Sequence, residues 1–159
     1  MQHNDEFFLK KAIEIAKMGM RQDLGGPFGA VVVKDGEIVG QSSNLVTSTN
    51  DPTAHAEVSA IRDACKNLAT YQLDGCVLYT SCEPCPMCLG AIYWARPERV
   101  VYAATHEDAD EIAGFDDKFI YEELDKKPAD RKIKMVQMLG ERGKEPFLEW
   151  KEKEDKKRY

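Results

Sequence analysis

The chain has 159 residues, of which 43% are hydrophobic, and this length and composition predict one domain with a substantial buried core. Its net charge of −6 argues against nucleic acid as the main partner, because affinity for phosphate groups comes largely from Lys and Arg. No stretch approaches the roughly 18 consecutive apolar residues of a membrane span.

The first third of the chain predicts a helix followed by a β-hairpin. Asp5 is a suitable N-cap for a helix in which apolar residues recur at helical spacing as far as Gly19, and Gly25-Gly26-Pro27 breaks it. Asp35-Gly36 is a strong signal for a two-residue hairpin turn. The expected elements are a helix over about residues 5–20, strands over 28–34 and 37–42, and a polar loop over 43–52.

The middle of the chain alternates between helices and strands. Asp74-Gly75 marks a turn, and Pro97 ends a helix because the residue before a proline disfavours the helical conformation. The expected elements are a helix over residues 53–67, a strand over 76–81, a helix over 84–95 and a strand over 99–103.

The last third of the chain has weaker patterns. Residues 105–115 are acidic and are expected to be irregular, and the elements expected after them are a short helix over 117–124, a fifth strand over 133–139 and a terminal helix over 146–157. A hairpin followed by strand–helix alternation predicts an α/β fold with a five-stranded mixed sheet covered by helices. We see no linker or internal repeat, so one domain is expected over residues 1–159.

Two cysteines at the start of a predicted helix form the core of a candidate metal site. Cys85 and Cys88 are three residues apart, so on a helix they point the same way, and the helix dipole favours their thiolate forms. Pro84 and Pro86 fit a first helical turn, where N–H groups lack partners. Two thiolates and an imidazole suit zinc, and a catalytic zinc site keeps a fourth position for water. His55 is predicted to be the third ligand.

The neighbours of these ligands suggest further roles. Glu57 follows His55 by two residues, so it is expected near the metal without binding it, as a catalytic proton shuttle. Cys82 competes as a ligand because it also forms a CxxC pair, with Cys85, but it is expected to lie outside the helix. A fourth ligand from Cys82 would make the zinc purely structural. Cys65 and Cys76 are expected to be buried, small apolar residues.

The N-terminus has neither the basic start nor the apolar block of a signal peptide, which predicts a cytoplasmic protein. Five cysteines in such a chain are expected to be metal ligands and free thiols and not disulfides.

The motif His-x-Glu followed by Pro-Cys-x-x-Cys matches the signature of zinc-dependent nucleobase and nucleoside deaminases. Beyond this motif, nearly the whole chain resembles the bacterial guanine deaminases of the cytidine deaminase-like superfamily. The resemblance is carried by residues 25–30, 48–57, 79–88 and 113–117 and by the final Tyr159.

This resemblance implies a three-layer α/β/α fold, one Zn²⁺ per subunit and the hydrolytic deamination of guanine to xanthine and ammonia in purine catabolism. Zinc is expected to activate a water molecule, and Glu57 to accept its proton and deliver protons to the ring nitrogen and the departing amine. A homodimer is also implied, in which the C-terminal helix and tail, about residues 140–159, pack on the partner subunit by exchange.

The family pattern places further residues near the base. Asn44 and Asp116 match positions beside the bound base, where an amide and a carboxylate recognise ring donors and acceptors. Phe28 and Trp94 are expected to offer apolar faces for stacking. Each residue also has a structural alternative, because Asp116 suits a helix N-cap, Asn44 suits a turn, and the two aromatic residues suit the core or an interface.

Two further contacts with the base are expected. The backbone of Ala54, which precedes His55, is expected to contact the ring, and Tyr159 is expected to cover the pocket, in its own or a neighbouring subunit.

Two other functions stay open from the sequence. One is a deaminase of another base or nucleoside, namely guanosine, cytosine or adenosine in transfer RNA. The other is a zinc-stabilised interaction domain without turnover, which retention of Glu57 argues against. Neither a membrane nor nucleic acid is expected as a partner.

Overall fold

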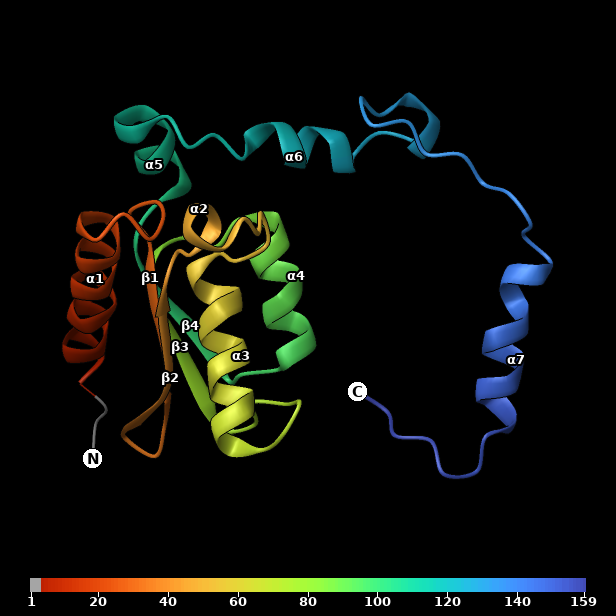
Figure 1. The fold of residues 1–159 in the computed structure, drawn as a ribbon, viewed down its shortest axis with the longest axis horizontal. Coiled ribbons are helices and arrows are strands. Elements are labelled where there is room, and N and C mark those ends of the chain that lie inside the picture. The colour runs from red at the N-terminus through yellow and green to blue at the C-terminus, as the bar shows by residue number, and fades with distance from the viewer. Residues whose placement is uncertain (1–3) are drawn as a thin grey trace. The chain divides into compact units, whose positions relative to one another are not determined.

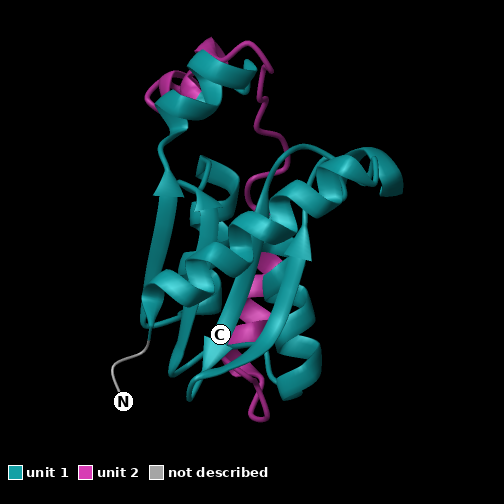
Figure 2. Ribbon diagram, turned by 90° about the vertical axis from the view of Figure 1, so that its left-hand side faces the viewer, with its two compact units in different colours: residues 1–117 teal, residues 118–159 magenta. Residues whose placement is uncertain are grey.

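The computed structural model describes residues 4–159 and divides the chain into two compact units (Figure 2). Unit 1 ends at Asp117, and unit 2 comprises Lys118–Tyr159. The expected single domain over residues 1–159 stays a prediction, and the two units are described separately.

Unit 1 is an α/β fold, as the element order predicted. It contains α1 (Asp5–Arg21), β1 (Gly29–Lys34), β2 (Glu37–Ser43), α2 (Val46–Thr49), α3 (Ala56–Leu68), β3 (Cys76–Cys82), α4 (Pro86–Ala95), β4 (Arg99–Ala104) and α5 (His106–Ala113). Unit 2 contains α6 (Lys118–Leu124), the short 3₁₀ turns η1 (Pro128–Asp130) and η2 (Arg142–Lys144), and α7 (Glu145–Glu152).

The sheet of unit 1 is mixed, with the strand order β2-β1-β3-β4. β1 is antiparallel to both β2 and β3, and β3 is parallel to β4. Figure 1 shows α1 on one face of this sheet and α3 with α4 on the other. Because side chains alternate along a strand, β3 supplies Val77 and Tyr79 to the core under α1, and Cys76 and Leu78 to the core under α3.

The predicted hairpin is present, and glycine lets a helix approach it closely. Asp35 and Gly36 have φ angles of 50° and 82°, as a two-residue turn between twisted strands requires. On the returning strand, a Cβ atom at Gly40 would lie 2.5 Å from the backbone nitrogen of Ala64. Gly40 therefore lets α3, which carries two of the predicted site residues near its start, pack directly on β2.

Two local predictions near helix starts were wrong. The N-cap of α1 is Asn4, whose side-chain oxygen accepts from the N–H of Phe7 at 3.1 Å, whereas Asp5 is the first helical residue. Residues 105–115, expected to be irregular, contain α5. Thr105 and Asp108 form a capping box there, which satisfies orphan N–H groups at the helix start.

The expected fifth strand was also wrong, since the sheet has four strands and residues 133–139 lie outside any helix or strand. A strand needs a neighbouring edge for its backbone hydrogen bonds, and unit 2 as described contains no other strand. Ile133 and Val136, which lie within this range, are 85% and 81% exposed. Other boundaries also differ from the expected ones: the polar loop contains the short α2, α3 begins at Ala56 and not at residue 53, and α7 ends at Glu152. The cysteine helix α4 begins at Pro86, so Pro84 precedes the helix and does not lie in its first turn.

No helix within residues 4–159 combines the length and the apolar character needed to cross a bilayer.

Candidate metal centre

The predicted ligands lie at the starts of two helices. His55 is the N-cap residue of α3 and Cys85 that of α4, and both have extended backbone conformations. Neither side chain makes a capping hydrogen bond, so both are available to the site. Pro86 occupies the start of α4, where its missing N–H costs nothing, and Cys88 lies in the first turn of the same helix.

The three ligand atoms form a compact group. The Nδ1 atom of His55 lies 3.5 Å from the Sγ atoms of both Cys85 and Cys88, and all three atoms lie within 4.8 Å of one another. A tetrahedral zinc ion with its usual bond lengths would separate nitrogen and sulfur ligands by about 3.6 Å. The donor set therefore fits zinc, and three protein ligands leave the fourth position that a catalytic site needs.

The protonation of the two cysteines is unequal. Hydrogen bonds from Cys88 and His55 lower the pKa of Cys85 to about 4, despite partial burial. The pKa of Cys88 is raised strongly, because its thiol bonds to the Cys85 sulfur in a buried setting close to Glu57. The Cys85 thiolate in turn raises the pKa of His55. Two adjacent thiolates repel each other, and a divalent cation offsets that repulsion, as expected of a metal-binding pair.

Glu57 lies beside the ligands, as predicted. It is in the first turn of α3, and only 5% of its surface is exposed. Its Oε2 atom is 3.2 Å from the sulfur of Cys88, and its Oε1 atom accepts from the hydroxyl of Thr80 at 2.7 Å. A buried carboxylate in contact with a ligand can exchange protons with a molecule at the metal.

Cys82 is not part of the ligand group. It ends β3, and its sulfur lies 3.5 Å from the carbonyl oxygen of Thr105. Burial raises the pKa of Cys82 to about 11, so its thiol stays protonated at neutral pH. All five cysteines are free thiols, with Cys76 buried and Cys65 half-buried.

Asn44 is buried, with its amide held in one orientation. Its Oδ1 atom accepts from the backbone N–H groups of Gly26 at 3.3 Å and Val46 at 3.0 Å. Because an N–H donor cannot point at the amide nitrogen, these bonds fix which end of the amide is the oxygen. Asn44 therefore has N–H donors to offer a ligand.

The backbone of Ala54 helps to hold the segment that leads to His55. Its carbonyl oxygen accepts from the N–H of Leu45 at 2.9 Å, and its own N–H donates to the carbonyl of Asp51 at 3.1 Å. The expected contact between Ala54 and a base stays a prediction.

The half-buried Phe28 contacts the loop that carries Asp116. Its ring meets that of Phe115 edge to face, with centroids 5.0 Å apart. Asp116 follows Phe115 directly and is exposed. The next residue, Asp117, was not singled out from the sequence. Burial raises the pKa of its carboxyl group, and the Cys85 thiolate adds to this effect, which places Asp117 within electrostatic range of the ligands.

The two remaining candidates are exposed. Trp94 lies on α4 with 62% of its surface exposed, so it is not a core residue, and Tyr159 is an exposed residue of unit 2. Their predicted roles at the base stay predictions.

The segment before Cys85 is held by an ion pair that the sequence did not predict. One carboxylate oxygen of Glu83 lies 2.8 Å from Nδ1 of His106 and also accepts from the His106 backbone N–H at 3.2 Å. The pair links the segment before Cys85 to α5 across a separation that no local sequence pattern reveals.

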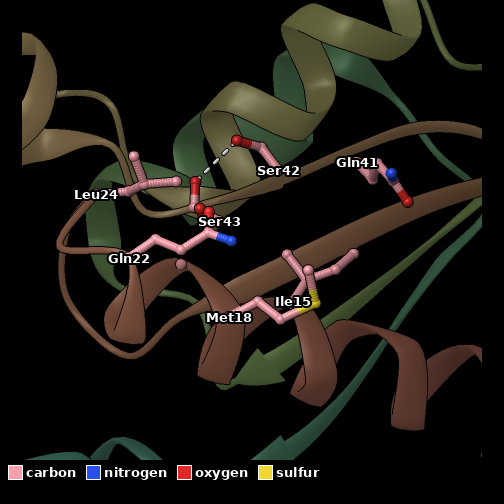
Figure 3. A pocket seen from close by; sticks show the side chains of 8 residues that line it. Ile15, Met18, Gln22, Leu24, Gln41, Ser42 and Ser43 are labelled. Carbon is pink, nitrogen blue, oxygen red and sulfur yellow. Dashed lines mark hydrogen bonds between the residues drawn. The ribbon is translucent and has the colours of Figure 1, made fainter.

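One pocket of the protein lies away from these residues. A cavity of about 210 Å³ lies between the end of α1 and β2, where Figure 3 shows its mixed apolar and polar lining. Its lining includes Ile15, Met18, Gln22 and Gln41 but none of the predicted site residues.

Comparison with known proteins identifies the family. The model of the cytidine and deoxycytidylate deaminase zinc-binding region matches residues 2–104. The guanine deaminase of Bacillus subtilis is 59% identical, over 98% of this chain and 99% of its own length. The crystal structure of that enzyme has a TM-score of 0.95 at 58% identity, with coverage of 100% of this chain and 99% of the other.

More distant relatives share less of the chain. A structure of guanine deaminase from Nitrosomonas europaea has a TM-score of 0.65 at 35% identity, with coverage of 70% of this chain and 64% of the other. A tRNA-specific adenosine deaminase of Aquifex aeolicus is 46% identical over 62% of this chain and 65% of its own length. With its His55, Cys85 and Cys88 zinc site and its α/β fold, the chain belongs to the cytidine and deoxycytidylate deaminase zinc-binding family.

Proposed function

We propose that this protein is a guanine deaminase, which hydrolyses guanine to xanthine and ammonia. The observation that carries the proposal is similarity to the Bacillus subtilis guanine deaminase along 98% of the chain. The tRNA-specific relative matches only 62% of the chain, so the shared motif region alone does not account for the likeness. The complete ligand group of His55, Cys85 and Cys88 supports a hydrolytic enzyme.

The residues at the metal centre have complementary tasks. Zinc held by His55, Cys85 and Cys88 supplies Lewis acidity that makes water a nucleophile near neutral pH. Glu57 accepts a proton from the attacking water at its Oε2 oxygen, which faces the ligands. It passes this proton to the ring nitrogen. It then takes the remaining proton from the hydroxyl group newly bonded to C2 and delivers it to the amine, so that the C2–N bond breaks and ammonia leaves. Water and guanine are thereby converted to xanthine and ammonia, and Glu57 regains its starting charge.

Base selection follows from the donors and acceptors nearby. Asn44 offers N–H donors, because its oxygen already accepts two backbone bonds, and these donors suit an acceptor of guanine such as O6. The Asp116 carboxylate is an acceptor and suits the ring N–H groups. Phe28, fixed against Phe115, supplies an apolar face for the ring. Ala54 completes the set from the His55 side.

The proposal extends to a homodimer in which residues 140–159 pack on the partner subunit and Tyr159 covers a base pocket. Trp94 is assigned to the base pocket or to this interface. The large apolar side chains of unit 2 support this dimer, because they are more exposed than is usual for a self-contained unit. The exposed ones include Phe119, Leu124, Met138, Phe147 and Leu148. Light scattering on the purified protein should give twice the mass of one chain.

A substrate panel tests the assigned function. Metal-replete protein should release ammonia from guanine, and not from guanosine, adenine, cytosine or cytidine. Release from guanosine would mean that the pocket tolerates a ribose. Absence of turnover on every small substrate would contradict the proposal, and deamination of adenosine in transfer RNA would replace it with the RNA-directed activity.

A further inference from the structure

A buried hydroxyl on the central strand contacts the proton shuttle. Thr80 lies on β3 and has no exposed surface. It is paired with Ala30 on one side and Tyr102 on the other, so its backbone is fixed by strands on both sides. Side chains alternate along a strand, which places Thr80 on the same face as Leu78, under α3 and its Glu57.

The two oxygens of Glu57 have different neighbours. Oε1 accepts from the Thr80 hydroxyl at 2.7 Å, whereas Oε2 lies 3.2 Å from the sulfur of Cys88. A second acceptor, the carbonyl of Cys82, lies 3.0 Å from the same hydroxyl. A hydroxyl has one hydrogen, and the shorter contact to a carboxylate is the stronger of the two. Thr80 therefore directs its hydrogen to Oε1.

We propose that Thr80 is a positioning residue for the deamination, one that anchors Oε1 of Glu57 so that Oε2 is the oxygen that carries the proton. This inference rests on the proposed function. A carboxylate on a flexible side chain can rotate and exchange its oxygens, and the bond from a fixed strand opposes that rotation. Because reaction rates depend steeply on the placement of the reacting groups, the anchor acts on turnover more than on substrate binding.

The test compares Thr80→Val, which keeps the shape without the hydroxyl, with Thr80→Ser, which keeps the hydroxyl. We expect Thr80→Val to lower kcat for guanine roughly 10- to 100-fold, a part of the 10²–10⁴-fold that acid–base catalysis contributes. KM and zinc content should stay close to the wild-type values. Thr80→Ser should restore kcat to within about threefold of wild type, since its hydroxyl can make the same bond.

Ser81→Ala is the matched control. Ser81 is also buried on β3, but its hydroxyl accepts from the N–H of Gly29 and lies on the opposite face of the strand. This variant loses a buried hydrogen bond without touching Glu57, so its kcat should stay near that of wild type. If Thr80→Val does not fold, Thr80→Ala replaces it, because that change places no methyl group against the carboxylate.

Three outcomes overturn the inference. The first is a Thr80→Val variant whose kcat equals that of wild type. The second is a loss of zinc, or a rise in KM, that accounts for the whole fall in activity of this variant. The third is an equal fall in Ser81→Ala, which would indicate a general packing effect. Wild-type protein without guanine turnover would contradict the proposed function and this inference together, whereas active wild type with unchanged Thr80 variants contradicts the inference alone.

Discussion

Units 1 and 2 differ in how their apolar residues are covered. Unit 1 has a core on each face of its sheet, and every residue of β3 from Cys76 to Cys82 is buried. Unit 2 contains no buried residue, and its large apolar side chains, among them Phe119, Met138 and Phe147, are exposed. Its internal contacts are mainly polar, as at Glu123, which accepts from Lys126 and from the backbone of Lys132.

The predicted catalytic residues lie in the unit with the buried core. The ligands and Glu57 lie in unit 1, where buried strands and helix starts fix their positions. Segments as short as unit 2 rarely build a sufficient core by themselves. We therefore expect damage to the metal centre to abolish chemistry outright, and damage to unit 2 to alter substrate use while unit 1 stays folded.

The largest effect is expected from loss of a zinc ligand. Cys88→Ser replaces a buried thiolate ligand of unit 1, so zinc content should fall well below one ion per chain and turnover should become undetectable. Metal analysis and ammonia release measure the two quantities on the same sample. Removal of zinc by a chelator from the wild-type protein should give the same loss, and restored activity on adding zinc back is the control. A fully active protein without metal would contradict the assignment of the site.

Glu57→Gln should separate metal binding from catalysis within unit 1. The amide keeps the size of the side chain but cannot accept and return a proton, so kcat should fall roughly 10²–10⁴-fold while zinc stays bound. Assays of ammonia release measure the fall in kcat, and metal analysis in parallel measures the bound zinc. Near-normal turnover would remove Glu57 from the mechanism.

Truncation of the chain after Lys157 tests unit 2. Loss of Tyr159 should lower kcat/KM for guanine roughly tenfold, the size of one lost contact of about 1.4 kcal/mol. Zinc content and the thermal unfolding of unit 1 should not change. Tyr159→Phe is a milder companion that keeps the ring. Unchanged kinetics in the truncated protein would count against a cover formed by the tail.

Tyr79→Phe should affect the stability of unit 1 but not its chemistry. The Tyr79 hydroxyl donates to Asp5 at 2.6 Å, and Asp5 also pairs with Arg99, which ties α1 to the sheet. Loss of this bond should reduce the free energy of unfolding by about 1 kcal/mol, with guanine turnover unchanged. Denaturant unfolding with parallel ammonia assays measures both effects.

The same substitution has a pH signature. Burial, followed by the bond to Asp5, raises the pKa of Tyr79 to about 12 in the folded protein, against an ordinary value of 10.0. Between these values the folded state binds more protons than the unfolded state, so this contribution to stability is lost as the pH rises from about 10 to about 12. The Phe variant should lack this part of the pH dependence. If the free energy of unfolding had the same dependence on pH in the wild type and in the Phe variant, the raised pKa of Tyr79 would be contradicted.

An effect as small as that of Tyr79→Phe is expected from Cys82→Ala. Because Cys82 lies outside the ligand group with a protonated thiol, one zinc ion per chain and normal turnover should persist, with a loss of stability of about 1 kcal/mol. A drop in zinc content would revive the four-ligand structural site.

The sequence alone was sufficient for the elements with strong local signals. The hairpin turn at Asp35-Gly36 needs positive φ angles that glycine and aspartate tolerate, and the paired cysteines at a proline-rich helix start indicate metal. These features depend on neighbours in the chain, so they were predicted together with the α/β fold. The prediction of a fifth strand over residues 133–139 failed because an apolar segment forms a strand only where another edge supplies hydrogen bonds.

The tertiary structure alone decided how distant residues combine. The 3.5 Å contacts of His55 with both cysteines required two helix starts to converge. The pairing of Glu83 with His106 required α5 to fold beside the segment that precedes Cys85. Thr80 carries no motif of its own, and it acquires its contact with Glu57 because β3 passes under α3. Such contacts depend on packing between separated segments, which no local pattern of residues encodes.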